Sequence, residues 1–204
     1  ANSARVGRAD DPMTRLQGTW ITAAAAQGAA AMLENAGFLA LFVGGCVRND
    51  LLGVPVSDLD LSTDARPDDV MRLAKASGIR VVPTGIDHGT VTLVLDGVPV
   101  ETTTFRKDIQ TDGRHAVVAF ADRVEEDAAR RDFTMNALYA DARGQVFDPL
   151  GSGISDLTAR HVRFIGDASA RLREDYLRAL RFFRFHAWYG DATEGPDADA
   201  VAAI

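Results

Sequence analysis

The chain has 204 residues, of which 47% are hydrophobic, a length and composition that allow one sizeable core and exclude a disordered chain. No apolar run is long enough to cross a membrane, so we expect no membrane partner. The net charge of −7 argues against a nucleic-acid-binding protein, but arginines cluster locally, for example at Arg130 and Arg131. Because the local field decides anion binding, the net charge does not exclude RNA as a partner.

The N-terminal part of the chain is expected to support the fold without taking part in chemistry. Residues 1–20 are predicted to be a mobile leader, since the segment is largely polar and has no clear period. Residues 22–36 predict an alanine-rich helix that Gly37 closes. No signal-peptide pattern is present and the single cysteine, Cys46, cannot form an internal disulfide, so we expect a cytoplasmic protein. No pattern in the sequence indicates the oligomeric state.

A glycine turn follows the apolar run of residues 39–43, which predicts a buried strand. Gly44 and Gly45 lead from this strand into a short helix that begins near Val47. A strand, a glycine turn and a helix N-terminus together direct backbone N–H groups at one point, and this arrangement suits a phosphate. Arg48, in the first helical turn, supplies a positive fork for the same anion. We therefore predict an anion site at this turn.

Two aspartates, Asp58 and Asp60, are predicted on the next strand, where residues two apart share a face. Leu59 and Leu61 then point into the core. Neighbouring carboxylates repel each other unless cations lie between them, so the pair predicts a magnesium site. A phosphate site beside a two-metal site is typical of phosphoryl or nucleotidyl transfer.

A third carboxylate, Glu101, lies on the last of three further strands. A helix that starts at Pro67 precedes them, and strands are predicted at residues 80–83, 90–95 and 98–105, the last two joined across Asp96 and Gly97. We expect Glu101 to face Asp58 and Asp60 as a third acid; the alternative is a solvated strand residue. Residues 106–118 have little apolar content and are predicted to form an exposed loop.

The segment of residues 125–137 is predicted to be helical through its arginine-rich part. Asp132 and Asn136 are four residues apart on this helix and therefore share a face, next to Arg131. The alternative is a surface helix with acid–base pairs at three- and four-residue spacing. Residues 138–140 and 146–147 predict a hairpin, and the turn that follows it is expected to be structural.

Residues 151–153 are the predicted hinge between a head (residues 21–150) and a helical neck (residues 151–204). A strong helix is predicted over residues 174–189, with Asp175 and Arg178 as neighbours on its surface. Arg181 and Arg184 continue a three-residue step that drifts by about 60° each time, so Arg184 is expected to lie round the side. The alternative for the pair Asp175 and Arg178 is an ion pair within the helix that contributes little.

Four segments in this order resemble the class II tRNA nucleotidyltransferases (CCA-adding enzymes) and the closely related bacterial poly(A) polymerases. They are Gly44-Gly45-x-Val47-Arg48 with Asp58-x-Asp60, Arg130-Arg131-Asp132-Phe133-Thr134-Met135-Asn136-Ala137, Asp148-Pro149, and Glu174-Asp175-Tyr176-Leu177-Arg178 with Arg181 and Arg184. Together they cover about residues 38–189. Asn49 departs from the pattern, since many members have Asp after the arginine, but no presumed metal ligand changes.

The resemblance implies an α+β fold, a nucleotidyltransferase (polymerase beta-like) head with a small mixed sheet flanked by helices, followed by an all-helical neck. It also implies the roles of individual residues. Asp58 and Asp60 hold two Mg²⁺ ions, Gly44, Gly45, Arg48 and Arg131 bind the triphosphate, Asp132 and Asn136 lie near the ribose, and Asp175 and Arg178 select the base, with Arg181 and Arg184 nearby. The loop of residues 106–118 would help to switch the choice of nucleotide.

The implied activity is the template-independent addition of CMP and AMP, from CTP and ATP, to the 3′ end of tRNA. One alternative is a poly(A) polymerase, or an enzyme that adds only CC or only A. The other belongs to a different class, a non-catalytic nucleotide- or RNA-binding module. Family members usually continue through helical body and tail regions that grip tRNA. We therefore expect this chain alone to bind nucleotide and metal but to act weakly on tRNA.

Overall fold

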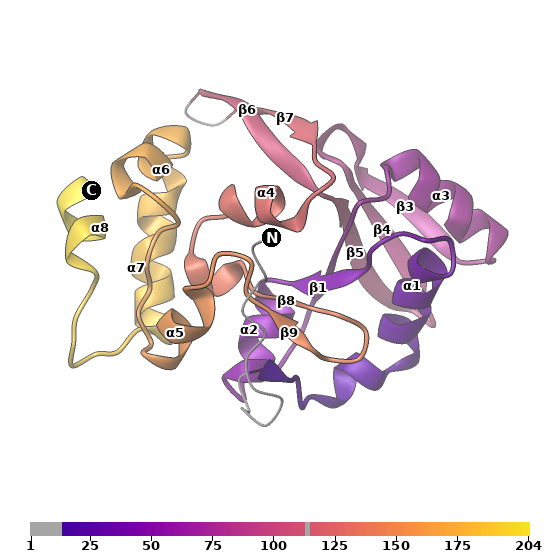
Figure 1. Cartoon of the computed structure of the whole chain (residues 1–204), viewed down its shortest axis with the longest axis horizontal. Helices are drawn as coiled ribbons and strands as arrows, with labels where there is room; N and C mark the ends of the chain where they lie inside the picture. The colour runs from indigo at the N-terminus through magenta and orange to yellow at the C-terminus, as the bar shows by residue number, and fades with distance from the viewer. Residues whose placement is uncertain (1–13, 113–114) are drawn as a thin grey trace.

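A seven-stranded mixed sheet organises the part of the chain that the computed structural model describes, residues 14–112 and 115–204 (Figure 1). Its strand order is β3-β4-β5-β2-β1-β8-β9. The strands are β1 (Leu41–Val43), β2 (Leu59–Thr63), β3 (Arg80–Gly85), β4 (Thr90–Leu95), β5 (Val98–Thr104), β8 (Tyr139–Ala140) and β9 (Val146–Phe147). Strands β2 and β5 are parallel and the other neighbours are antiparallel, so the predicted mixed sheet is confirmed.

Two helices, α1 (Ala24–Glu34) and α3 (Pro67–Ala76), pack against this sheet and against each other. The inner residues of α1 are mostly small, and Ala26, Ala29 and Ala30 have no exposed surface. Small side chains let the helix backbone lie close to the strands, so the alanine-rich segment supplies packing, as predicted. A shorter helix, α2 (Gly45–Leu51), packs beside β1 and β2.

Four further helices gather on the other side of the molecule. They are α5 (Gly153–Thr158), α6 (Ala168–Glu174), α7 (Leu177–Tyr189) and α8 (Ala198–Ala203), on the left in Figure 1. Phe133 connects them to the sheet side, because its ring centroid lies 5.0 Å from that of Phe164 and 4.9 Å from that of Phe185. The core is therefore continuous across the boundary placed at residue 150, and that boundary stays a prediction.

The described residues of the predicted leader, 14–20, pack against the rest of the chain. Leu16 is only 5% exposed, and Arg15 forms a β-bridge with Gln145. The backbone N–H of Gly18 donates to Asp50 Oδ2 at 2.8 Å. The prediction of a mobile leader is wrong for residues 14–20, because they are held by side chains and strands far along the sequence. Residues 1–13 lie outside the described residues.

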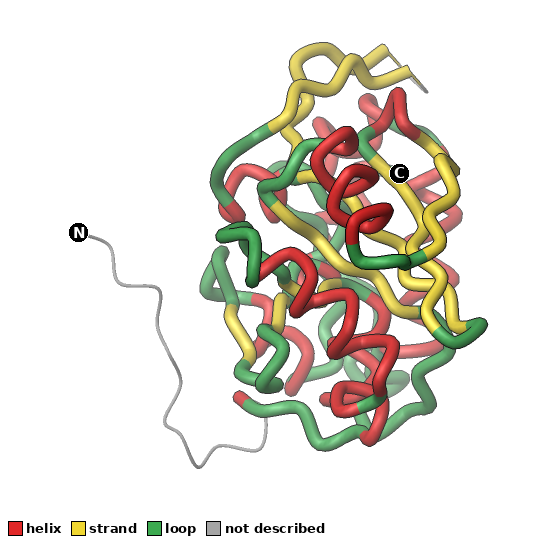
Figure 2. The backbone as a smooth tube through the Cα atoms, turned by 90° about the vertical axis from the view of Figure 1, so that its right-hand side faces the viewer, coloured by secondary structure: helices red, strands yellow, loops and turns green. Residues whose placement is uncertain are grey.

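The predicted loop of residues 106–118 is a β-hairpin. Strands β6 (Arg106–Asp112) and β7 (His115–Phe120) pair antiparallel in a sheet of their own. Figure 2 shows this hairpin extending from the top of the molecule, away from the main sheet. A two-stranded ribbon can form without an apolar face, so its strands lack the period of two that marks a half-buried strand. This is why composition alone indicated a loop.

The helix predicted over residues 125–137 is interrupted. Helix α4 (Val124–Ala129) ends before the two arginines, and η4 (Thr134–Asn136) is a separate 3₁₀ turn. Between them the chain pairs with residues 163–165, since the N–H of Ile165 donates to the carbonyl of Asp132 at 3.0 Å. The prediction is wrong because this long-range pairing replaces the helix that the acid–base spacing favoured.

The helix predicted over residues 174–189 is two helices. Helix α6 ends at Glu174, Asp175 is extended (φ −155°, ψ 108°), and α7 starts at Leu177. The Asp175 carboxylate accepts a hydrogen bond from the Leu177 N–H at 2.9 Å. Aspartate is favourable near the start of a helix because its carboxylate can accept from one of the N–H groups that the first helical turn leaves unpaired. The predicted helical face that joins Asp175 to Arg178 is therefore absent.

Replacing Gly153 by alanine is expected to lower the free energy of unfolding by about 1–3 kcal/mol. A Cβ added there would lie 2.7 Å from the Thr134 carbonyl oxygen and 2.8 Å from Leu138 Cδ2, so the predicted hinge is tightly packed at this residue. Urea unfolding of the variant measures the loss. Gly85→Ala is the control for an added methyl group, because a Cβ at Gly85 would meet only Thr90 Cβ at an ordinary 3.6 Å and the φ of Gly85, −171°, is extended. Equal effects in the two variants would contradict the packing argument.

Candidate active site

The turn at Gly44 has a backbone conformation that only glycine adopts readily. Its φ is 72° and its ψ is −122°, and α2 starts at the next residue. A Cβ at Gly44 would lie 3.7 Å from Arg131 Nη1, so the turn lies next to the Arg131 guanidinium. The structure thus brings the glycine turn and Arg131 together, although the two are 87 positions apart in the sequence.

Asp60 and Glu101 are direct neighbours on adjacent strands. They are Cα partners in the parallel pair β2–β5, which places both side chains on the same face of the sheet. Asp58 lies one residue before β2, is exposed, and accepts a hydrogen bond from Ser57 Oγ at 2.8 Å. The placement of Asp58 on the strand itself is therefore wrong by one residue, because β2 begins at Leu59.

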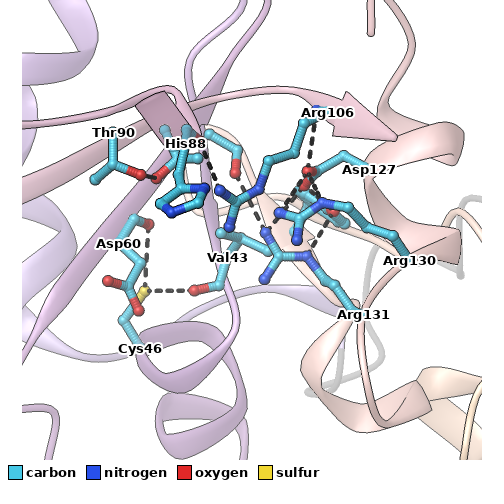
Figure 3. A network of polar contacts seen from close by, with 12 residues as sticks. Val43, Cys46, Asp60, His88, Thr90, Arg106, Asp127, Arg130 and Arg131 are labelled. Atoms are coloured by element: carbon cyan, nitrogen blue, oxygen red, sulfur yellow. Dashed lines mark hydrogen bonds and ion pairs between the residues drawn. The ribbon is translucent and has the colours of Figure 1, made fainter. Parts of the chain in front are cut away.

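A cavity of about 190 Å³ collects the charged groups of this region. Both signs of charge meet in it, with the acidic groups on β2 and β5 and the basic groups at the start of β6 and on the segment after α4. Its lining residues are Val43, Asp60, Leu61, Ser62, Glu101, Thr103, Arg106, Arg130 and Arg131. Figure 3 shows Asp60 to the left of Val43 and the guanidinium groups of Arg130 and Arg131 to its right. An anion bound by the arginines would thus lie next to carboxylates that can hold a cation.

The carboxyl group of Asp60 has an unusual proton affinity. Burial is the main cause that raises its pKa to about 6, and repulsion from Glu101 and Asp58 adds to the shift, while Arg131 opposes it. A cation between the carboxylates would remove this repulsion. The repulsion among Asp58, Asp60 and Glu101 would therefore be weaker with a cation bound.

The free energy of unfolding of the metal-free protein is expected to fall as the pH rises through the range in which Asp60 ionises. The pKa of Asp60 is about 6 in the folded chain against an ordinary 3.8, so the folded state holds the proton more tightly. This contribution to stability is complete below the ordinary pKa and is lost as the pH rises through 6. Thermal unfolding in EDTA should show Asp60→Asn gaining in Tm over wild type between about pH 4.5 and about pH 7.5. A difference that stays constant over this range contradicts the shift.

Asp127 holds the two arginines of the cavity in place. Its carboxylate has no exposed surface and accepts hydrogen bonds from Arg131 Nη2 at 2.9 Å, Arg130 Nε at 3.0 Å and the Tyr139 hydroxyl at 2.7 Å. Burial alone would raise the pKa of Asp127, but the charges of Arg131 and Arg130 lower it to about 2. Figure 3 shows both guanidinium groups converging on this carboxylate. One negative charge thus orders two positive ones, and the group formed by Asp127, Arg130 and Arg131 keeps a net positive charge.

Sequence analysis missed Asp127, Tyr139 and Arg130 as site residues. A signal was present, because Asp127 precedes Arg130 and Arg131 by three and four residues. That spacing was interpreted as pairing on an exposed helix face. Only the burial of Asp127 distinguishes the two cases, and burial depends on the position of α4 over β8, where Tyr139 lies.

The side chains of Asp132 and Asn136 lie together, as predicted, but for a different reason. Asn136 Nδ2 donates to Asp132 Oδ1 at 3.0 Å, although the two residues are not on one helix. Arg181 Nε donates to Asp132 Oδ2 at 2.9 Å, which links this pair to α7. Arg48 Nη1 donates to Asn136 Oδ1 at 2.5 Å. These residues therefore form one network between α2, η4 and α7.

The structure does not bring together the side chains predicted to read the base. Arg178 pairs with Glu174 and donates to the Arg171 carbonyl oxygen at 3.1 Å, while Asp175 accepts a hydrogen bond from the Leu177 N–H at the start of α7. Arg184 is exposed, with its guanidinium carbon 5.9 Å from the centroid of the Trp188 ring. Base contacts by Asp175 and Arg178 would require these side chains to exchange their present partners.

The donors at Asp58 and Asp60 fit a hard cation such as Mg²⁺. Both offer carboxylate oxygens, the ligands that Mg²⁺ prefers. Burial, with repulsion from Glu101 and Asp58 added, raises the pKa of Asp60, and a bound cation would favour its charged form. Among the residues that the structure describes, no three His, Cys, Asp or Glu side chains form a ready-made metal cluster. A site with two carboxylates is consistent with the usual coordination of Mg²⁺, which is commonly bound by one or two carboxylates together with substrate phosphates.

The sequence of residues 40–163 matches the family described as the Poly A polymerase head domain, and the match covers well over half of the chain. The chain belongs to the poly(A) polymerase head-domain family. The glycine turn, the strand with Asp60 and the segment with Arg131 all fall within the matched residues. The resemblance and the fold class expected from the sequence are thus confirmed for this head domain.

Relatives of this head domain include longer nucleotidyltransferases. The CCA-adding enzyme of Latilactobacillus sakei is 45% identical over 160 residues, 78% of this chain and 39% of the relative. A crystal structure of the Bacillus stearothermophilus CCA-adding enzyme in complex with CTP has a TM-score of 0.77 and 38% identity, and the match covers 88% of this chain and 42% of that one. A tRNA nucleotidyltransferase complexed with a primer tRNA and an incoming ATP analog has a TM-score of 0.63 and 29% identity, over 78% of this chain and 44% of that one.

The chain spans about two fifths of the length of the curated relatives that it matches. Its head domain therefore corresponds to one part of those proteins. Within the described residues, no helix has both the length and the apolar character needed to span a bilayer.

Proposed function

We propose that the protein adds CMP and AMP, from CTP and ATP, to the 3′ end of tRNA without a nucleic-acid template. The observation that carries the proposal is the cavity in which Asp60 and Glu101 face Arg130 and Arg131 beside the Gly44 turn. This arrangement suits a triphosphate with its counter-ions. The relatives solved with CTP, and with a primer tRNA and an ATP analog, support the choice of substrates.

In the proposed mechanism, Arg131 binds the triphosphate together with the N–H groups at the glycine turn. Its guanidinium lies against Gly44 and is fixed by Asp127, so it needs little rearrangement to meet the phosphates. Burial alone would lower the pKa of Arg131, but Tyr139 and Asp127 raise it, and the group stays charged. Asp58 and Asp60 would hold two Mg²⁺ ions, which activate the attacking 3′-hydroxyl and stabilise the departing pyrophosphate.

The remaining roles in the proposal follow the resemblance. Glu101, in register with Asp60, would act as the third acid of the site. Asp132 and Asn136 would lie near the ribose, and Asp175 and Arg178 would select the base. A cytoplasmic location is also part of the proposal, and it rests on the single cysteine, which is free and buried.

Primer extension tests the proposal. The complete gene product is incubated with tRNA lacking its CCA end, Mg²⁺, and CTP and ATP, and the 3′ ends are sequenced. The expected products end in CCA, with release of pyrophosphate. Tails of A only, or products that stop after CC, identify a poly(A) polymerase or a specialised enzyme. Nucleotide binding without pyrophosphate release identifies a non-catalytic binding module and overturns the proposal.

A further inference from the structure

Arg48 is enclosed by protein groups in this structure. It is 6% exposed, and each nitrogen of its guanidinium has an acceptor. Nη1 donates to Asn136 Oδ1 at 2.5 Å, Nη2 donates to the Tyr189 hydroxyl at 2.9 Å, and Nε and Nη2 donate to Asn49 Oδ1 at 3.2 and 2.8 Å. A side chain with this many partners already has a structural task, whatever it contributes to anion binding.

Two rings of α7 stack on the same guanidinium. The Arg48 guanidinium carbon lies 4.1 Å from the ring centroid of Tyr189 and 5.1 Å from that of Phe185. Arginine is suited to this position because its planar cation can stack on a ring and donate in its own plane at the same time. Tyr189 therefore contacts Arg48 in two ways, through its ring and through its hydroxyl oxygen.

A second attachment joins α7 to the same group of residues. Arg181 donates to Asp132 Oδ2 through Nε at 2.9 Å and Nη2 at 2.5 Å, and Asp132 accepts from Asn136 at 3.0 Å. The contacts thus run from Tyr189 through Arg48, Asn136 and Asp132 to Arg181, and both ends lie on α7. The ends are eight residues apart, which is about 12 Å along a helix axis.

Two attachments fix a helix more completely than one does. A single contact leaves a helix free to rotate or tilt about that point, whereas two contacts about two turns apart restrain both motions. Here the restraint is set relative to α2, the helix that follows the glycine turn. The orientation of α7 is therefore tied to the triphosphate side of the cavity.

We propose that Tyr189 is a positioning residue, which through Arg48 holds α7 in the orientation that nucleotide selection requires. The inference rests on the proposed function, in which the base is read by Arg178 on α7 and by Asp175, two residues before this helix. With the Tyr189 contact removed, α7 keeps the Arg181 attachment and the ring contacts of Phe185, but it loses the contact at its C-terminal end. The base contacts then lose their fixed distance from the phosphates, and both nucleotides bind less tightly.

The test compares Tyr189→Phe, Tyr189→Leu and the control Tyr176→Phe in the complete gene product. Tyr189→Phe keeps the ring and removes the hydroxyl, Tyr189→Leu removes both, and Tyr176 is 66% exposed on the same part of the chain. We expect Tyr189→Leu to raise KM for CTP and ATP about tenfold, with a smaller rise for Tyr189→Phe. KM for tRNA and kcat should stay within about twofold, and Tyr176→Phe should match wild type.

Amide hydrogen exchange of α7 supplies a readout that does not depend on activity. Faster exchange of residues 177–189 in Tyr189→Leu, with unchanged exchange in β4 and β5, supports the attachment. Unchanged KM values together with unchanged exchange of α7 overturn the proposal, as does an equal loss of kcat for all substrates. If wild type adds no nucleotide, the proposed function fails by itself, and the exchange data still decide whether Tyr189 holds α7.

Discussion

Replacing Asp60 by asparagine is expected to lower the rate of nucleotide addition by roughly 10³-fold or more, because a metal contributes several kcal/mol to such a step. The variant should fold, since asparagine removes the repulsion from Glu101 and Asp58 that raises the pKa of Asp60. Initial rates of CMP incorporation into tRNA lacking CCA, at saturating CTP, measure the effect. Thermal unfolding in EDTA should show a Tm equal to or above that of wild type at neutral pH.

Two further variants make this result specific. Asp58→Asn should reduce the rate by a similar factor if both aspartates hold metal. Asp122→Asn is the matched control, because the Asp122 side chain is 84% exposed and forms an ion pair with Arg66 alone among the described residues. Its rate should stay within about twofold of wild type, as for most exposed substitutions. A wild-type rate in either Asp60→Asn or Asp58→Asn would remove the basis for the metal assignment.

Replacing Asp127 by asparagine is expected to lower the free energy of unfolding by about 3–5 kcal/mol, the usual effect of removing one partner from a buried ion pair. The substitution keeps the shape of the side chain and removes the only charge that faces both Arg130 and Arg131 in the described contacts. Those guanidinium groups then share a confined site without compensation. Urea unfolding monitored by tryptophan fluorescence gives the change.

The control for Asp127 lies on the same helix. Glu125 pairs with Arg123, and both side chains are largely exposed, so Glu125→Gln should change the free energy of unfolding by no more than about 0.5 kcal/mol. The two variants should also differ in acid. The pKa of Asp127, about 2, is below its ordinary value, so its stabilising effect is complete above that ordinary value and is lost as the pH falls through 2. An Asp127→Asn variant as stable as Glu125→Gln would contradict the role of Asp127.

The local patterns predicted most elements of the sheet side correctly. The strands predicted at 80–83, 90–95 and 98–105 are observed at 80–85, 90–95 and 98–104, and the turn between the last two lies at Asp96 and Gly97, both of which have positive φ. Local patterns failed where a distant segment provides the partner. The stretch around Phe133 pairs with residues 163–165, and Asp175 interrupts a helix that its neighbours favoured.

The pairing of Asp60 with Glu101 shows how much of the site the sequence predicts. Alternation along each strand predicted which way each carboxylate points, because successive side chains on a strand point to opposite faces. The register of β2 against β5 makes the two carboxylates neighbours. This register depends on the packing of α3, β3 and β4, which lie between β2 and β5 in the sequence.

By itself the sequence determined the family, the glycine turn, and the aspartates on or beside one strand, because these depend on residue types at fixed short spacings. Only the tertiary structure decided that Asp127 is buried between two arginines and that Arg48 is enclosed by α7. Both depend on which helix covers which side chain. Charged residues at the same sequence spacing can be solvated in one protein and buried in another. The interaction energy of a charge pair differs severalfold between these two surroundings, so the fold has to be known before the role of the pair can be assigned.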